Sequence, residues 1–376
     1  EQTRGESERL RAVFGRPKPL RETRQSLPAW AKREEIQRLV RDNQVVVVQG
    51  DTGCGKSTQV PQFILEDWVE RGEAGAALML MTQPRRISAI GVAERVAVEM
   101  DSPIGELAGY SIRLESKKSA RTKILVCTTG VVLRRLEADR ELRGVTHIVV
   151  DECHERDLDT DFLLIVLRDL LPRRPSLRII LMSATINAHL FCDYFGGCPS
   201  ILIQGRTFPV QAHFLENALD HTGFVVEPNS EYSKQNADHL SPSEEAELRA
   251  MYEKDEFREL IGGGISRHAI VQLQRMDPEK INFDLVAAVV KHIHTQVDPV
   301  PGGPGRGGKR PGAILVFVPG FGEIKRCIRA LGCDMPGQDD RHGKGKGGGK
   351  GGAAATAAGL WVLPLHSMIS VAEQRL

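Results

Sequence analysis

Short apolar runs alternate with helix-compatible stretches from residue 31 to residue 215. The clearest run is Val45–Val48, because four valines in succession are typical of a parallel strand buried on both faces. The predicted strands are Val45–Val48, Ala77–Met81, Tyr110–Leu114, Ile124–Cys127, Val145–Val150, Ile179–Met182 and Ile201–Ile203. The predicted helices are Ala31–Arg41, Phe63–Trp68, Ile87–Met100, Val131–Leu136, Phe162–Leu170 and Ala188–Phe195. Repeated strand and helix units predict an α/β fold, with helices on both faces of a mostly parallel sheet.

The regular alternation ends after Phe214. Residues 228–264 are acidic and polar, and residues 298–312 and 334–359 are low-complexity insertions rich in glycine. Between and after these segments, the pattern predicts a helix over Phe283–Ile293, a buried strand over Ala313–Val318 and a short strand over Leu360–Leu363. We therefore expect a basic arm over residues 1–30, a first domain over 31–215, a linker with an acidic insertion over 216–276, and part of a second domain over 277–376.

Length and composition agree with this division. A chain of 376 residues is long enough for two domains, and 41% hydrophobic residues suffice for ordinary cores. No apolar run approaches the roughly 18 residues of a membrane span, so we expect no membrane as partner. The seven cysteines lack the CxxC and histidine spacing of a zinc site, which favours reduced thiols and no bound zinc. We expect a cytoplasmic protein, with nuclear and organellar locations still open.

A glycine-rich loop carries the strongest chemical signal. The sequence GDTGCGKS fits the pattern G-x-x-x-x-G-K-[ST] and directly follows a predicted strand. Its glycines let successive N–H groups point at one anion, with a helix N-terminus behind them. Lys56 supplies a positive charge for the β- and γ-phosphates, and Ser57 a hydroxyl for Mg²⁺. The residues predicted to bind ATP or another NTP are Gly50, Asp51, Thr52, Gly53, Cys54, Gly55, Lys56, Ser57 and Thr58.

A pair of carboxylates follows the predicted strand Val145–Val150. Asp151 and Glu152 stand at its carboxyl end, which is the arrangement of a Walker B motif. Asp151 is predicted to hold Mg²⁺, and Glu152 to orient the attacking water. His154 is predicted to lie near the γ-phosphate, and a surface acidic turn is the alternative interpretation. The predicted catalytic residues are therefore Glu152, Lys56, Asp151 and His154, and the predicted metal ligands are Ser57, Asp151 and Glu152.

Basic and hydroxyl side chains follow other strands. Arg85 and Arg86 open a helix, where guanidinium and backbone N–H groups together can seat phosphodiester oxygens. Arg113, Thr129 and Arg134 stand at later strand ends or helix starts. We predict RNA contacts at these five positions, although a solvated basic surface explains the last three equally well.

Two hydroxyl residues, Ser183 and Thr185, follow the predicted strand Ile179–Met182. Their side chains are candidates for coupling this strand end to His154. A simple strand-to-helix cap accounts for the same residues about as well.

In order and spacing, the motifs GDTGCGKST, TQPRR, TTG, DECH, SAT and LVFVPG resemble those of superfamily 2 DEAH/RHA-box (DExH) RNA helicases. Asp151–Arg156, Thr160–Leu163 and Tyr194–Phe195 are typical of the same family. The resemblance extends from Leu27 to Leu376 apart from the insertions. It implies two RecA-like domains, NTP-dependent translocation on single-stranded RNA, and unwinding from a 3′ overhang.

The resemblance also implies finer roles. Arg95 would stack on the nucleobase and add to the nucleotide-binding set. Residues 223–232 and 276–282 are most similar to the branch that serves the small ribosomal subunit in translation initiation, so that subunit is an expected partner. The phosphate loop departs mildly from the family, with Asp51 for the usual Glu and Cys54 for the usual Ser.

The family pattern continues beyond Leu376 into two further motifs, one of which carries arginine fingers. Such an arginine is worth on the order of 10³ to 10⁵ in rate in comparable enzymes. The chain as given is therefore expected to bind ATP but to hydrolyse it poorly. A helicase motor, an NTP-gated RNA-binding module and an NTPase unrelated to nucleic acid are the three interpretations, and the motifs favour the first.

Overall fold

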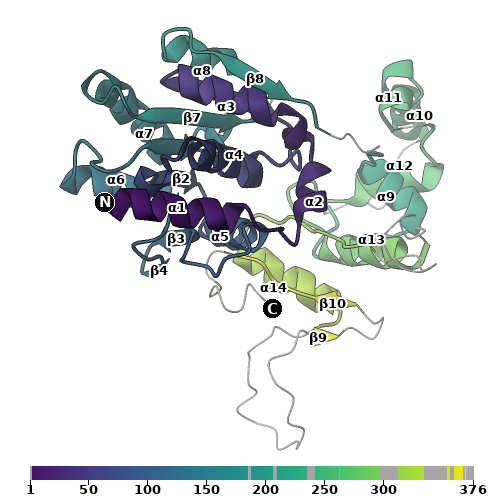
Figure 1. Ribbon diagram of the computed structural model, residues 1–376. Coiled ribbons are helices and arrows are strands. Elements are labelled where there is room, and N and C mark those ends of the chain that lie inside the picture. The colour runs from purple at the N-terminus through teal and green to yellow at the C-terminus, as the bar shows by residue number, and fades with distance from the viewer. Residues whose placement is uncertain are drawn as a thin grey trace, which may run out of the picture. The chain divides into compact units, whose positions relative to one another are not determined.

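The computed structural model describes residues 2–184, 188–205, 210–234, 242–261, 263–296, 312–333, 354–355, 360–366 and 369. The chain divides into two compact units, residues Glu1–Phe208 and Pro209–Leu376. The first unit carries the phosphate loop and the acidic motif, and the second is mostly helical (Figure 1). No helix in the described part of the chain is long and apolar enough to cross a membrane.

An eight-stranded sheet, counted over the described residues, is the frame of the first unit. Its strands are β1 Val45–Gly50, β2 Met79–Gln83, β3 Ala108–Ile112, β4 Glu115–Lys117, β5 Ile124–Thr128, β6 His147–Val150, β7 Arg178–Ser183 and β8 Ser200–Ile203. They lie in the order β4-β3-β5-β2-β6-β7-β1-β8, and all neighbours are parallel except β3 and β4. The predicted α/β fold with a mostly parallel sheet is confirmed.

Helices cover both faces of this sheet (Figure 1). They are α1 Gln2–Phe14, α2 Arg21–Gln25, α3 Arg33–Asp42, α4 Lys56–Arg71, α5 Arg86–Glu99, α6 Thr129–Ala138, α7 Leu158–Leu170 and α8 Ala188–Tyr194. On one face, α6, α7 and α8 share a core with alternate strand residues such as Val47, Leu80 and Ile148. On the other face, α5 packs on β2, β3 and β5, and α4 lies beside α5. Burial on both faces explains the unbroken valine run of β1.

The N-terminal segment differs from the predicted arm. Residues of α1 pack against α4, and Leu10 is fully buried. Lys18 Nζ donates to the carbonyl oxygens of Val13 and Met100, at 2.9 Å each. This segment is therefore a packed part of the first unit. The sequence pattern did not predict this packing because basic residues outnumber the apolar residues of the one buried helix face.

The second unit contains six helices and two very short strands within the described residues. They are α9 Leu215–Thr222, α10 Pro242–Tyr252, α11 Asp255–Ile261, α12 Arg267–Arg275, α13 Phe283–Gln296, α14 Phe321–Ala330, β9 Ala354–Ala355 and β10 Trp361–Val362. Helices α13 and α14 pack together around Phe283 and Ile328. The acidic stretch predicted as a linker thus includes two helices, α10 and α11.

The predicted strand Ala313–Val318 is not found. Residues 312–318 have no regular secondary structure, and Leu315 and Phe317 are exposed. A strand needs a hydrogen-bonded neighbour, and the described residues place none beside this run. The expected second RecA-like domain therefore stays a prediction.

Candidate nucleotide and nucleic-acid site

The phosphate loop connects β1 to α4. Gly53 and Gly55 have φ values of 81° and 97°, which favour glycine, and α4 begins at Lys56. A Cβ atom on Gly50 would lie 2.8 Å from the Ile203 carbonyl oxygen, so the loop is also held closely against β8. These two features give the loop the tight curl that an anion cradle needs.

Lys56 lies inside this loop. Its side chain is buried, and Nζ donates to the carbonyl oxygens of Gly50 and, at 3.2 Å, of Asp51. A buried ammonium group surrounded by backbone dipoles is a strong site for phosphate oxygens. The ammonium group thus lies inside the loop, and the role predicted for Lys56 stays a prediction.

Asp151 directly follows β6 and is almost fully buried, with 2% of its surface exposed. Its carboxylate accepts hydrogen bonds from Gln83 Nε2 at 2.5 Å and from the Glu152 N–H at 3.0 Å. Burial raises the pKa of Asp151 to about 6, and a hydrogen bond with Ser57 partly opposes this shift. The structure thus brings together the hydroxyl and the carboxylate that the sequence predicted as metal ligands.

This pair fits Mg²⁺ in its chemistry. Mg²⁺ prefers hard oxygen ligands and keeps several waters, with one or two protein carboxylates. Ser57 and Asp151 supply such oxygens beside the loop, and the side chain of Glu152 is partly exposed. These residues would hold the ion, which supplies charge neutralisation to the phosphates when bound.

The turn after β6 places the other catalytic candidates. Glu152 has a φ of 54°, a left-handed conformation that costs energy in a residue other than glycine and is common at functional turns. His154 Nδ1 lies 3.5 Å from Glu152 Oε2 and accepts a hydrogen bond from the Ala184 N–H at 3.2 Å. His154 is therefore linked to the residue that follows β7 through a backbone N–H, whereas the prediction from the sequence placed this link on hydroxyl side chains.

The hydroxyl residues predicted for this coupling are placed differently. Ser183 is fully buried, and its Oγ donates to the carbonyl oxygen of Ala184 at 2.8 Å. Thr185 lies outside the described residues. Cys153, on the same turn, is also buried, which raises the pKa of its thiol to about 12 and so disfavours the thiolate at neutral pH.

Strand order divides the carboxyl edge of the sheet into two parts. We call the ends of β1, β7 and β6 the nucleotide half, because they carry the phosphate loop, Ser183 and Asp151. We call the ends of β2, β5 and β3 the basic half, because Arg85 and Arg113 follow two of these strands. Since β2 and β6 are neighbours, the two halves are continuous.

The basic half exposes the predicted RNA-binding arginines. Arg85, Arg86, Arg113 and Arg134 are exposed, and Arg85 also pairs with Glu155 at 3.1 Å. The Thr129 hydroxyl is instead buried and lies 3.4 Å from the Thr160 hydroxyl. The Thr129 side chain is therefore not available to an external ligand.

Sequence reasoning missed contacts between the phosphate loop and the segment before the first domain. The Ala29 N–H donates to the Cys54 carbonyl oxygen at 3.0 Å, and a Cβ atom on Gly55 would lie 3.2 Å from Leu27 Cδ1. Motif patterns carry no signal for such a contact, because it joins two loops that are distant in sequence.

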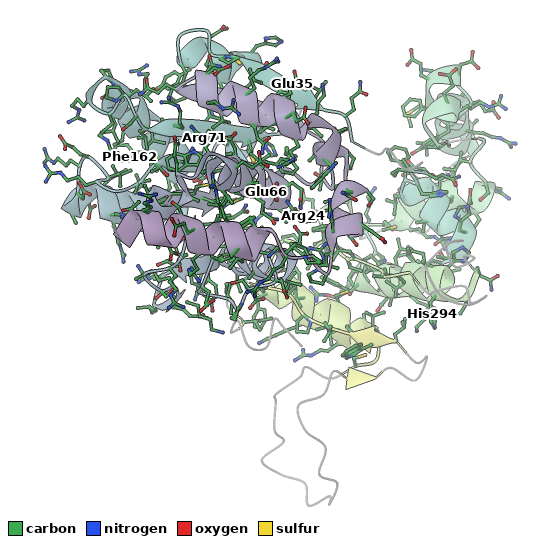
Figure 2. All side chains as sticks on the ribbon, in the orientation of Figure 1. Arg24, Glu35, Glu66, Arg71, Phe162 and His294 are labelled. Carbon is green, nitrogen blue, oxygen red and sulfur yellow. The ribbon has the colours of Figure 1, made fainter. Side chains whose placement is uncertain are left out.

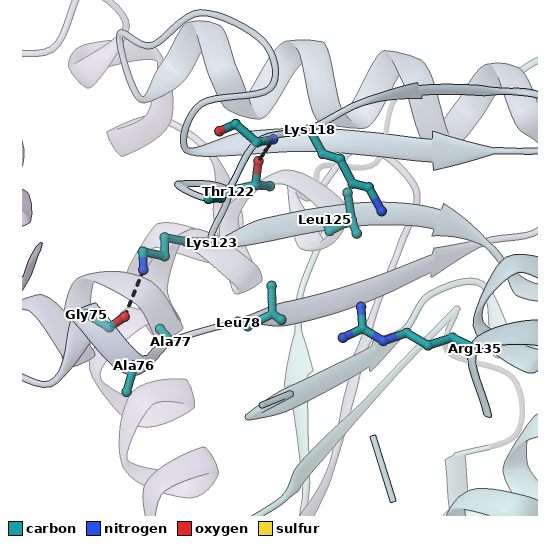
Figure 3. A pocket seen from close by; sticks show the side chains of 11 residues that line it. Gly75, Ala76, Ala77, Leu78, Lys118, Thr122, Lys123, Leu125 and Arg135 are labelled. Atoms are coloured by element: carbon teal, nitrogen blue, oxygen red, sulfur yellow. Dashed lines mark hydrogen bonds between the residues drawn. The ribbon is translucent and has the colours of Figure 1, made fainter. Parts of the chain in front are cut away.

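A separate pocket of about 590 Å³ lies near the amino ends of β2 and β5 (Figure 3). Leu78 and Leu125 line it together with the cations Lys118, Lys123 and Arg135, and Lys123 Nζ donates to the Gly75 carbonyl oxygen at 2.9 Å. Ligands of open parallel sheets gather at the carboxyl ends of the strands. This pocket therefore is not part of the nucleotide site.

The fold and the two motifs at its carboxyl edge define a P-loop nucleotide-binding domain. Residues 31–191 match the DEAD/DEAH box helicase family. DHX57 of Homo sapiens is 43% identical over 380 residues, covering 94% of this chain and 26% of the relative. The DExH-box ATP-dependent RNA helicase DExH3 of Arabidopsis thaliana is 44% identical over 318 residues, covering 80% of this chain and 25% of the relative.

The ATP-dependent DNA/RNA helicase DHX36 of Bos taurus is 40% identical over 361 residues, covering 93% of this chain and 33% of the relative. The chain belongs to the DExH group of the DEAD/DEAH box helicases, and the resemblance of its motifs is confirmed. It spans 25% to 33% of the length of these three relatives.

Proposed function

We propose that this chain is the ATP-binding part of an ATP-dependent RNA helicase, which couples NTP hydrolysis to movement along single-stranded RNA. The observation that carries this proposal is the continuous carboxyl edge, where a buried phosphate site adjoins a row of exposed arginines. The names of DExH3 and DHX36 as ATP-dependent helicases support the same function.

Each residue of the nucleotide half has a chemical role in this proposal. Lys56 and the N–H groups of the loop bind the β- and γ-phosphates. Glu152 orients and polarises the attacking water, and His154 senses the γ-phosphate and transmits its presence to β7 through the Ala184 N–H. Ser57 and Asp151 hold Mg²⁺.

RNA binds along the basic half in this proposal. Contacts from arginines and helix N-termini reach phosphate and sugar, so binding has little sequence preference and weakens with salt. The Arg85–Glu155 ion pair joins the helix that starts the RNA surface to the turn that carries Glu152. Nucleotide-dependent movement of that turn would therefore reach the RNA surface directly.

The test is ATP turnover by the chain of residues 1–376, with and without single-stranded RNA. We expect slow turnover that rises with RNA and falls about 10²- to 10⁴-fold in Glu152→Gln, with ATP binding retained. Glu137→Gln, an exposed change on α6, is the matched control and should turn over like the parent.

Two outcomes would favour other functions. RNA binding that depends on ATP, without turnover in either protein, favours an NTP-gated RNA-binding module. ATP binding without any affinity for RNA favours an NTPase unrelated to nucleic acid. A partnership with the small ribosomal subunit, a role in translation initiation and a cytoplasmic location remain predictions that rest on the sequence resemblance.

A further inference from the structure

A buried carboxylate, Glu99, lies at the end of α5 and belongs to none of the helicase motifs. It is fully buried, and both of its oxygens are used. Oε2 accepts hydrogen bonds from Gln59 Nε2 at 2.7 Å and Gln62 Nε2 at 2.6 Å. Oε1 accepts one from Arg95 Nε at 2.6 Å. Glu99 therefore connects α5 to α4, the helix that begins with Lys56.

The charge of Glu99 is balanced locally. A buried carboxylate is costly unless it is paired and hydrogen-bonded. Arg95 is one partner, and Arg24 Nε lies 3.8 Å from Oε2. Arg24 itself donates hydrogen bonds to Gln59 Oε1 and to Glu66, at 2.8 Å each (Figure 2). These contacts give the Glu99 carboxylate two arginine partners and two amide donors.

The network also reaches the phosphate loop. Gln59 Nε2 lies 2.8 Å from the Thr58 hydroxyl, and Gln62 Nε2 donates to the Thr58 carbonyl oxygen at 2.7 Å. Both glutamines therefore join Glu99 to the first turn of α4, where Lys56 and Ser57 stand. The glutamines keep their own contacts with Thr58, and they set the distance of Glu99 from the phosphate loop.

Arg95 is oriented by the same carboxylate. Its Nε is committed to Glu99, while 44% of its side chain stays exposed. One fixed nitrogen restricts rotation of the planar guanidinium and leaves a face of the group available for stacking. Without Glu99, the arginine would sample several rotamers at its exposed position.

We propose that Glu99 is a positioning residue, which holds the base-contacting Arg95 at a fixed distance and orientation from the phosphate loop. One bound nucleotide can then contact Arg95 with its base and the phosphate loop with its phosphates at the same time. This inference rests on the proposed function, which requires ATP binding, and on the base-stacking role that the family resemblance implies for Arg95. A plain structural brace is the competing account of the same contacts.

Comparison of ATP with inorganic tripolyphosphate separates the two accounts. Both ligands use the phosphate loop, but only ATP carries a base. We expect Glu99→Gln and Arg95→Ala each to weaken ATP binding by about tenfold, the scale of one cation–π stacking contact. Tripolyphosphate affinity should change less than about twofold, and the double variant should bind ATP no more weakly than Arg95→Ala alone.

Glu99→Asp is the second variant, because it keeps the charge of the buried network while shortening its reach to Arg95. It should show the same selective loss for ATP, and it replaces Glu99→Gln if that protein does not fold by circular dichroism. Glu137→Gln is the control and should bind both ligands like the parent chain.

Three results would overturn the inference in distinguishable ways. Equal weakening of ATP and tripolyphosphate by the Glu99 variants would make Glu99 a structural brace. A selective loss in Arg95→Ala with none in the Glu99 variants would show that Arg95 needs no positioning. No loss in Arg95→Ala would instead show that Arg95 makes no base contact, whereas a parent chain that binds no ATP would be a failure of the proposed function.

Discussion

The two halves of the carboxyl edge differ in how far their charged side chains are exposed to water. In the nucleotide half, Lys56 and Asp151 are 6% and 2% exposed, and each makes several hydrogen bonds. In the basic half, the side chain of Arg85 is 69% exposed and Arg86 is also on the surface. One sheet thus carries a rigid, desolvated site next to a solvated one.

This difference fits the two ligands of the proposed function. A triphosphate has a fixed shape, and electrostatic interactions with it are strongest where water is excluded and the donors are already in place. An RNA strand that must slide needs contacts that form and break easily, which exposed arginines provide. Substitutions in the two halves should therefore differ in size and in their sensitivity to salt.

The largest effect is expected at Lys56. Its ammonium is buried inside the loop, so Lys56→Ala removes the main charge for the β- and γ-phosphates, and surrounding groups cannot replace it. We expect ATP binding to weaken at least about 100-fold, since hydrogen bonds to charged groups are worth roughly 1.5–3 kcal/mol each. Isothermal titration calorimetry measures this loss.

The control for Lys56→Ala is Lys117→Ala, which removes an exposed lysine from β4. Its ATP affinity should match that of the parent chain. Unchanged ATP binding by Lys56→Ala would contradict the nucleotide half as defined here.

The same contrast explains how much the sequence could predict. The nucleotide half was predictable because its loop and its acidic pair are local patterns tied to buried strands. The order of the strands, which places β2 beside β6 and joins the two halves, is a long-range property that periodicity does not encode.

Other features were beyond the reach of local patterns for the same reason. The burial of the Thr129 hydroxyl depends on Thr160, which lies on another helix. The contact of Ala29 with the phosphate loop and the Glu99 network each join segments that are far apart in sequence. The short strand β4 was missed because Glu115–Lys117 is polar, as an edge strand usually is.

A smaller effect is expected in the basic half. The double variant Arg85→Ala and Arg86→Ala removes two exposed charges at the start of α5, and we expect RNA affinity to fall by about 10-fold to 100-fold. The slope of log affinity against log salt should become shallower by about 1.4, because each single-strand phosphate contact contributes about 0.7.

Fluorescence anisotropy with a single-stranded RNA measures both quantities for this double variant. ATP affinity serves as the internal control, since neither arginine belongs to the phosphate loop. A loss of RNA affinity that leaves the salt slope unchanged would show that the arginines support the fold of this surface and do not contact phosphates.

The smallest expected effect concerns the energetic cost of burial at the amino edge of the sheet, opposite the nucleotide half. His147 begins β6, is 1% exposed and packs edge-on against Trp68, with 5.1 Å between the ring centroids. Burial, assisted by the positive charges of Arg178 and Arg71, lowers the pKa of His147 to about 3. The folded protein therefore keeps this imidazole neutral at pH values where the unfolded chain binds a proton.

The sign of the pH dependence follows from this difference. Below pH 6.5, roughly the pKa of His147 in the unfolded chain, the unfolded state binds a proton that the folded state does not bind. Stability therefore falls as the pH is lowered. Between pH 7.5 and pH 5.5, His147 should account for a loss of about 1 kcal/mol in the free energy of unfolding. The loss should continue until the pH approaches 3.

Urea titrations followed by tryptophan fluorescence test this prediction at both pH values. His147→Leu should remove the loss of about 1 kcal/mol from the pH dependence, whatever its effect on stability at pH 7.5. His189→Leu changes an exposed histidine on α8 and should leave the pH dependence as it is. If His147→Leu retains the full pH dependence, His147 is protonated in the folded protein, and burial at the start of β6 is less complete than its 1% exposure implies.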